Sequence, residues 1–285
     1  MPQRKETDIR HAQQPHPRAV AVATVDASRL LSKATPLRSR EFPILVCFRA
    51  SSRSARLLSM AVTSVLDREM FSEAEAARLL RVPQSTLHYW LEGGVRRGKT
   101  YKPVIRPESL GNRPAVTWAE FIEAGLLREY RRKHRVPMAE LRAFIDLLRD
   151  RYGVPYPLAH HRPFVADRRL LLDAQDAVGL DAEFCLVAVA SGQLILTPPS
   201  QTFVERVTWS DDVATGWRPH DDPSSPVRMA PDVRFGRPAV NGVSTEVLWE
   251  HAEAGEDVDE VAEAFDLSPG DVRWALAYET SLRAA

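Results

Sequence analysis

The segment Ser72–Leu91 constrains the fold of this 285-residue chain more than any other, because its pattern predicts two short helices joined by a tight turn. Ser72 can cap the first helix, and Glu75 can complete a capping box with it. Pro83 cannot continue the first helix and can start the second, and two consecutive glycines then end the pattern. The small core that two crossing helices need is supplied by Ala76, Ala77, Leu80, Val82, Leu87, Trp90 and Leu91.

The second predicted helix is polar at its start, where a DNA-reading helix presents side chains to the major groove. Glutamine can read adenine, hydroxyl groups can reach bases or phosphates, and the basic segment that follows suits a wing over the DNA backbone. The alternative interpretation is a two-helix packing unit with no DNA role. The predicted DNA-contacting residues are Gln84, Ser85, Thr86, His88 and Tyr89 on the helix, and Arg96, Arg97, Lys99, Tyr101 and Lys102 on the wing.

Charge is divided unevenly along the chain, although the formal net charge is zero. Residues 1–60 carry a net charge of +7 and residues 61–162 a net charge of +6, whereas residues 163–285 carry −13. A basic first half favours an anionic partner such as nucleic acid. The acidic remainder favours either plain solvation or a basic protein partner.

The two cysteines, Cys47 and Cys185, are too few for a disulfide framework or a cysteine-rich zinc site. The longest apolar run near the N-terminus, Phe42–Phe48, is too short to span a bilayer and begins too late for a secretory signal. We therefore expect a cytoplasmic protein without a membrane span.

The periodicity along the chain predicts an α+β protein in four parts. Residues 1–60 have no sustained period and form either a disordered arm or an over-long start before Met60. Residues 61–160 form a winged helix-turn-helix head with two further helices. Residues 161–226 form a β-rich middle with short strands, and residues 227–285 a small three-helix domain similar to a helix-turn-helix.

Helix starts and short apolar runs supply the finer predictions. A capping box at Thr117 and Glu120 begins one helix, Met138–Arg151 forms the next, and Ser268 caps the last. A turn at Ser191 joins two strands, and Pro219–Pro226 is a linker. The runs interpreted as strands are Arg169–Leu172, Phe184–Val189, Leu194–Thr197 and Phe203–Trp209.

The stretch Pro83–Trp90, PQSTLHYW, resembles the second helix of the MerR-like regulators, which often has the pattern S-x-S-T-L-R-Y-W. The resemblance implies a DNA-binding winged helix-turn-helix at this place. His88 stands where arginine is common in that family. The base preference of the helix therefore cannot be carried over from the family.

A second resemblance covers Pro231–Tyr278, which is similar to a small antitoxin domain long catalogued as a domain of unknown function. The pattern of that domain is P-x-V-x-F-G-x-P-x-V-x-G, then A-G, an acidic helix and D-V-x-x-A-L-x-Y. In this chain the turn at Gly242–Thr245 is shorter than the corresponding turn of the domain. The middle of the chain also looks like VapB-type antitoxins that combine a MerR-like head with this tail. The matching residues are Pro231, Phe235, Gly236, Pro238, Gly242, Gly255, Asp271, Val272, Ala275, Leu276 and Tyr278.

These resemblances imply an antitoxin that neutralises a PIN-domain ribonuclease toxin and represses its own operon by binding operator DNA. The expected assembly is a homodimer or a toxin–antitoxin hetero-oligomer. The aromatic residues of the tail suit either its core or a surface that binds the toxin. The candidate toxin-binding residues are Trp249, Phe265, Arg273, Trp274 and Tyr278.

No catalytic constellation, metal site or cofactor motif emerges from the sequence, so we expect no enzyme and no cofactor. The adjacent pair His160 and His161 points in different directions on regular structure, and His220 lies in a proline-flanked loop. The alternative function is a ligand-responsive MerR-like transcriptional regulator, which would need an effector pocket or a long dimerisation helix after the wing. A hydrolase would need an assembled site, which the sequence does not provide.

Overall fold

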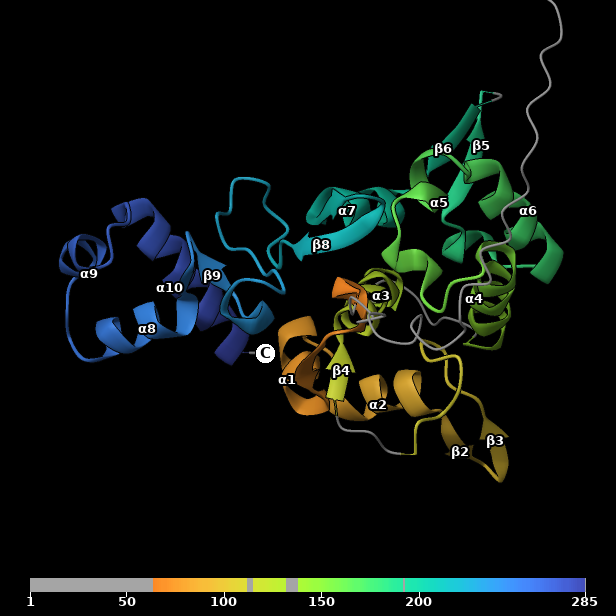
Figure 1. Cartoon of the computed structure of the whole chain (residues 1–285), viewed down its shortest axis with the longest axis horizontal. Helices are drawn as coiled ribbons and strands as arrows, with labels where there is room; N and C mark the ends of the chain where they lie inside the picture. The colour runs from red at the N-terminus through yellow and green to blue at the C-terminus, as the bar shows by residue number, and fades with distance from the viewer. Residues whose placement is uncertain (1–63, 112–114, 132–137, 192, 285) are drawn as a thin grey trace, which may run out of the picture. The chain divides into compact units, whose positions relative to one another are not determined.

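The computed structural model describes residues 64–111, 115–131, 138–191 and 193–284, all within one compact unit (Figure 1). The expectations for residues 1–60, including the disordered arm, Phe42–Phe48 and Cys47, lie outside the described residues. The α+β class is confirmed, because helices alternate with five two-stranded antiparallel sheets in the described part of the chain. The paired strands are β1 with β4, β2 with β3, β5 with β6, β7 with β8, and β9 with β10.

The described part of the chain up to Tyr152 contains four helices of eight residues or more, together with four short strands. The predicted helix pair is present as α1, Glu73–Leu80, and α2, Gln84–Glu92. The remaining elements, after a 3-10 turn at Val65–Asp67, are β1 (Glu69–Ser72), β2 (Gly94–Arg96), β3 (Lys99–Tyr101), β4 (Ala115–Thr117), α3 (Trp118–Arg131) and α4 (Met138–Tyr152).

Helix α3 lies at the centre of the fold and is buried on all sides. Its apolar residues Trp118, Phe121 and Ile122 have no exposed surface. Its start is fixed by the predicted capping box, in which Thr117 N donates to Glu120 Oε2 (2.9 Å) and Glu120 N donates to Thr117 Oγ1 (3.3 Å). A helix that is buried all round also buries its charged residues, which must then find partners inside the protein.

The middle of the chain contains more helix than the sequence predicted. The prediction of a strand at Arg169–Leu172 is wrong, because this run begins α6, and Phe203–Trp209 is divided between α7 and β7. The hairpin around Ser191 is confirmed by the pairing of β5 with β6. The bounds are α5 (Arg162–Val165), α6 (Arg168–Val178), β5 (Val187–Ala190), β6 (Gln193–Leu196), α7 (Pro198–Arg206), β7 (Val207–Ser210) and β8 (Val213–Trp217), with 3-10 turns at Pro157–Ala159 and Ala182–Phe184.

The predicted linker Pro219–Pro226 is an irregular loop that is tied to the core. The buried Arg206 donates to the carbonyl of Pro219 (2.6 Å) and to the carboxylate of Asp221 (2.9 Å). The ring of His220 meets the ring of Trp274 edge-on, with centroids 5.1 Å apart. This segment is therefore held on both sides, by the middle of the chain and by its last helix.

The C-terminal part contains three helices after a short hairpin. Its last helix begins at the predicted cap, where Ser268 Oγ accepts from Asp271 N (3.1 Å). The helix before it begins at a full capping box formed by Asp257. No helix in the described ranges has the length and apolar character needed to cross a membrane. The bounds are β9 (Ala239–Val240), β10 (Val243–Ser244), α8 (Thr245–Glu253), α9 (Val258–Ala264) and α10 (Pro269–Arg283), after a 3-10 turn at Arg234–Gly236.

Candidate nucleic-acid interface

Helices α1 and α2 pack through a small apolar core and are joined by a three-residue turn (Figure 1). Ser72 Oγ accepts from Glu75 N (3.2 Å), which confirms the predicted cap of α1. Arg81 closes α1 in the left-handed conformation, with φ 53° and ψ 47°. The carbonyl of Pro83 then accepts from Thr86 N (2.8 Å), which starts α2. Fully buried residues on both sides of the turn include Ala76, Leu80, Leu87, Trp90 and Leu91.

The predicted DNA-contacting residues of α2 divide into an exposed and a buried set. Gln84 and Ser85 are exposed at the first turn of the helix. Nδ1 of His88, whose side chain is 43% exposed, lies 3.0 Å from a carboxylate oxygen of Glu73. Thr86 and Tyr89 are buried, so the surface of α2 does not present their side chains and their assignment as DNA contacts is corrected. Tyr89 instead packs against Tyr101, with ring centroids 6.3 Å apart.

The predicted wing is the hairpin β2–β3, in which Val95 pairs with Thr100. Its turn residues, Arg97 and Gly98, both have positive φ, as a two-residue hairpin turn requires. At Gly93, which precedes the hairpin, a Cβ atom would lie 2.2 Å from the carbonyl oxygen of Tyr101, so only glycine fits. Exposed residues of the hairpin and of its exit are Arg97, Lys99 and Lys102, whereas Tyr101 is half-buried.

The segment after the hairpin is fastened to the end of α2 by backbone bonds. The carbonyl of Trp90 accepts from Val104 N (2.8 Å) and from Ile105 N (2.9 Å). Arg149 of α4 donates to the same segment, at the carbonyls of Val104 and Ile105. The path of the hairpin relative to α2 is therefore set by contacts outside the hairpin.

A buried charge network completes this attachment and has no counterpart in the sequence-based expectations. Arg106, which is 1% exposed, donates to the carboxylates of Glu92 and Glu120 and to the carbonyl of Ala115 (2.8 Å). Burial pushes the pKa of Glu92 upward, but bonds from Ser109 and Arg106 outweigh it and hold that pKa below its usual range. One guanidinium thus joins the end of α2 to β4 and to the start of α3.

The C-terminal part of the chain contacts α1 directly. Arg237 Nε donates to Glu75 Oε1 (3.0 Å), so the carboxylate expected to complete the capping box binds this arginine. Arg81 donates from Nη2 to Ser281 Oγ (2.6 Å), and its guanidinium lies 6.0 Å from the ring centre of Tyr278. The turn of the helix pair is therefore anchored on α10.

The candidate toxin-binding residues have different surroundings. Tyr278 is 1% exposed and belongs to the core, so its assignment to a binding surface is corrected. Trp249 and Trp274 are half-buried against Arg283 and His220, and Phe265 is half-buried against His251. Arg273 is exposed. Within the described ranges, no three His, Cys, Asp or Glu side chains are grouped so that they could hold a metal ion.

Comparisons with known proteins extend over most of the chain. Residues 227–278 match the family model described as a protein of unknown function, DUF433. "Putative antitoxin VapB45" of Mycobacterium tuberculosis is 26% identical over 225 residues, which cover 74% of this chain and 93% of the relative. The crystal structure of Rv2018 from the same organism superimposes with a TM-score of 0.61 at 24% identity over 74% of this chain and 99% of that chain, and so shares its fold.

A further relative gives the family. The uncharacterized protein Rv2308 of Mycobacterium tuberculosis is 33% identical to this chain over 242 residues. The match covers 79% of this chain and 96% of that protein, so it includes nearly the whole relative. The chain belongs to the same family as Rv2308.

Proposed function

We propose that the chain is the antitoxin of a type II toxin–antitoxin system, with a DNA-binding head in residues 61–160 and toxin-binding surface in the acidic remainder. The observation that carries the proposal is the arrangement of α1, α2 and the hairpin β2–β3, which has the element order of a winged helix-turn-helix. The similarity to a protein named as an antitoxin supports the second half of the proposal. The chain has no catalytic role in this proposal.

The DNA surface consists of the first turn of α2 and the exposed side of the hairpin. Gln84 and Ser85 are exposed at the helix start, and the first backbone N–H groups of a helix can bind an anion such as a phosphate. Arg97, Lys99 and Lys102 add exposed positive charge next to that helix. Because Thr86 and Tyr89 are buried, the proposed contacts with base edges come from the exposed residues of α2 and from His88.

The toxin in this proposal is a PIN-domain ribonuclease, and the complex represses its own operon. An RNA-cleaving partner needs positive charge to hold its substrate. Residues 163–285, with a net charge of −13, provide the opposite charge. Trp249, Phe265, Arg273 and Trp274 keep exposed surface in this part of the chain and remain the proposed toxin contacts.

Co-expression with the product of the adjacent gene tests this function. The expected result is a stable complex in which the ribonuclease activity of the partner is lost. The parent chain and a variant with Arg96, Arg97 and Lys99 changed to alanine should inhibit equally, because the wing is not part of the toxin surface. An adjacent gene without a nuclease-like product, or a nuclease that stays active in the complex, would contradict the proposal.

The wing variant should bind all DNA sequences more weakly. Replacing Arg96, Arg97 and Lys99 by alanine removes up to three positive charges of the protein that would lie over DNA phosphates. The slope of log K against log salt concentration should become shallower by about 0.9 for each phosphate that is no longer neutralised. Fluorescence anisotropy across a salt titration measures this slope. Equal slopes for the variant and the parent would exclude the wing from the interface.

Replacing Gln84 by alanine should act on specificity. Loss of a bidentate hydrogen bond to adenine should cost about 1–3 kcal/mol at one base pair and leave affinity for unrelated DNA unchanged. Binding to a set of single-base operator variants identifies that base pair. Thr86→Val is the matched control, since Thr86 is buried and should not change the base preference.

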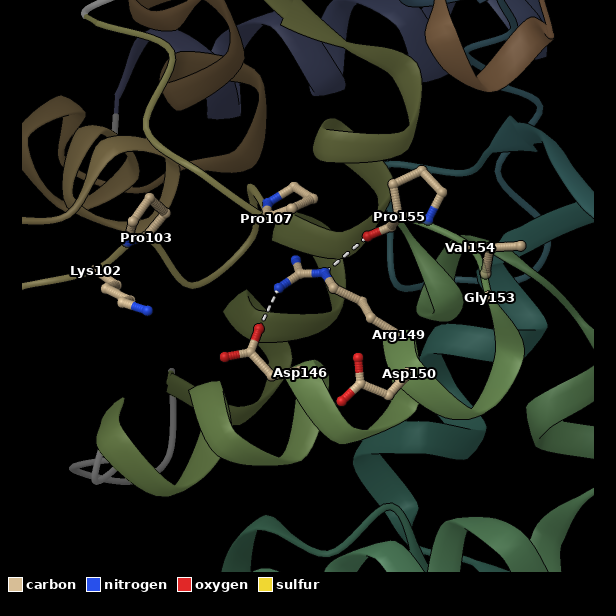
Figure 2. Close-up of a pocket in the computed structure, with 9 residues that line it drawn as sticks. All are labelled: Lys102, Pro103, Pro107, Asp146, Arg149, Asp150, Gly153, Val154 and Pro155. Carbon is tan, nitrogen blue, oxygen red and sulfur yellow. Dashed lines mark hydrogen bonds and ion pairs between the residues drawn. The ribbon is translucent and has the colours of Figure 1, made fainter.

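A ligand-responsive regulator of the MerR-like type is the second candidate function, and a pocket of about 500 Å³ favours it. Figure 2 shows this pocket between the exit of the wing, at Lys102 and Pro103, and the α4 residues Asp146, Arg149 and Asp150. Arg149 is occupied by Asp146 (2.7 Å) and by the carbonyl of Pro155 (2.8 Å). A thermal-shift screen separates the two functions, because only a ligand-responsive regulator should be stabilised by small effectors.

A further inference from the structure

His88 of α2 is held by an acidic residue of the neighbouring helix. Its Nδ1 atom lies 3.0 Å and 3.3 Å from the two carboxylate oxygens of Glu73, the first residue of α1. The side chain of Glu73 is only 10% exposed, whereas that of His88 is 43% exposed. A nearly buried carboxylate therefore fixes the ring on one side, and the ring keeps surface for a partner outside the chain.

The chemistry of this pair decides which ring nitrogen carries the proton. An ionised carboxylate only accepts hydrogen bonds, so Nδ1 of His88 donates to Glu73. A neutral imidazole has one N–H group and one acceptor nitrogen, and the bond made by one nitrogen sets the role of the other. Nε2 of His88, which has no hydrogen-bond partner among the described residues, is then an acceptor.

This acceptor lies on the face of α2 that the proposed function assigns to DNA. Gln84 and His88 are four positions apart, so their side chains share one face of the helix. Glu92 comes next on that face, but its side chain is 6% exposed and is bound to Arg106. His88 is therefore the last residue on this face of α2 with a polar atom left to meet a base.

The major groove of DNA offers both donors and acceptors to such a side chain. The exocyclic amino groups of adenine and cytosine are donors there, whereas N7 and O6 of guanine and O4 of thymine are acceptors. An acceptor at Nε2 of His88 can bind only the amino groups. An arginine in its place would select the opposite set, because a guanidinium group only donates hydrogen bonds.

We propose that Glu73 is a positioning residue for base recognition, which holds His88 so that Nε2 accepts a hydrogen bond from the amino group of an adenine or a cytosine. This role rests on the proposed DNA-binding function and adds to it the base edge that His88 reads. Glu73 is nearly buried, so it acts through the ring of His88 and not by touching DNA.

The tautomer of His88 is measured first, on the full-length chain without DNA. At about pH 8.5, above the range in which histidine ordinarily titrates, long-range proton–nitrogen NMR spectra should show the proton of His88 on Nδ1. Glu73→Ala removes the acceptor and should move the proton toward Nε2, the form that predominates in free histidine. Glu75→Ala is the matched control, because Glu75 belongs to the same turn of α1 but binds Arg237. His88→Ala lacks the signal and so identifies it.

Binding is then measured at the same pH on a duplex from the promoter of the chain's own gene, with one amino group removed at a time. Purine replaces adenine and pyrimidinone replaces cytosine, so the two bases are distinguished. At one position the loss of affinity should be about tenfold in the parent chain and in Glu75→Ala, should shrink in Glu73→Ala, and should vanish in His88→Ala. Comparing the altered and unaltered duplex within each protein removes the general effect of a lost charge. An adenine read by Gln84 is recognised separately, because its loss persists in all four proteins.

A parent chain with the proton of His88 on Nε2 overturns the proposal. So does a tautomer that Glu73→Ala leaves unchanged, or a set of losses that are the same in His88→Ala as in the parent chain at every position. A loss at deazaguanine, which lacks the N7 acceptor, would show that His88 is a donor if that loss vanished in His88→Ala, and would also overturn the proposal. A chain that binds no DNA overturns the proposed function as well, whereas each of the other results leaves that function intact.

Discussion

Replacing Arg106 by glutamine should lower the free energy of unfolding by about 3–5 kcal/mol, because the carboxylates of Glu92 and Glu120 would stay buried without their cation. Both keep other donors. Glu92 accepts from Ser109 Oγ (2.6 Å), and Glu120 accepts from Thr117 N (2.9 Å). These remaining bonds place the expected loss near the lower end of the range. Urea denaturation at neutral pH measures it.

The loss caused by Arg106→Gln should depend on pH. In the parent chain, the folded pKa of Glu92 lies below its usual value of 4.5, so the stabilisation is present above pH 4.5 and fades as pH falls through the folded pKa. The variant lacks the cation that keeps this carboxylate ionised. The gap in stability between the two proteins should therefore narrow below pH 4.5, and a gap that widens there would contradict this account.

The same variant should also lose DNA affinity, because Arg106 fixes the exit of the wing against α2. Arg97→Gln is the control for stability alone, since Arg97 is exposed and its replacement should cost less than about 0.5 kcal/mol of stability, although Arg97 belongs to the proposed DNA surface. Combining Arg106→Met with Glu92→Gln and Glu120→Gln removes the buried charges together and should recover much of the stability. Failure of this combination to recover any stability would show that the network is not the cause.

Replacing Glu123 by glutamine should stabilise the protein by about 4 kcal/mol at pH 8. Glu123 is fully buried in α3, and this burial raises its pKa to about 8 despite the opposing charge of Arg149. Its Oε1 accepts from Leu158 N (2.9 Å), and its Oε2 has no hydrogen-bond partner within the described residues. A neutral amide of the same shape keeps the bond to Leu158, and folding of the variant requires no uptake of a proton at this position.

The pH dependence gives the clearest test of the Glu123 prediction. Between pH 4.5 and 8 the folded chain holds a proton on Glu123 that the unfolded chain has lost. The free energy of unfolding should therefore fall by about 1.4 kcal/mol for each unit by which the pH rises. Glu123→Gln should abolish that slope. Glu108→Gln is the control, because Glu108 is exposed and should leave the slope unchanged. A parent chain whose stability shows no such dependence on pH would refute the prediction that Glu123 is protonated in the folded chain.

Helix starts were predictable from the sequence because caps are local. Ser72, Thr117 and Ser268 each bond to a backbone group within three positions, and a four-residue window contains all the information needed. The strand predicted at Arg169–Leu172 failed for a related reason. A short apolar run fits a strand or one turn of a helix equally well, and only the helical spacing of Leu171, Ala174 and Gln175 shows which one forms.

The candidate site was predictable only in part, because burial depends on residues far apart in the chain. Thr86 and Tyr89 are polar or amphipathic, and their position on α2 suggested DNA contacts, but packing against other elements buries them. Arg106 and Glu123 resemble ordinary surface charges in sequence, since nothing nearby marks them as internal. The ring of Phe235 is the opposite case, because large apolar side chains are usually buried and the loop geometry exposes this one.

The anchor between Arg81 and Ser281 also has a consequence for the order in which the chain is made. The two residues are 200 positions apart, so at about 5–20 residues per second Arg81 is synthesised about 10–40 s before its partner exists. Through that interval the left-handed turn between α1 and α2 has its local backbone bonds but lacks the side-chain bond to α10. A ribosome that stopped before Ser281 would therefore release a helix pair with an unanchored turn.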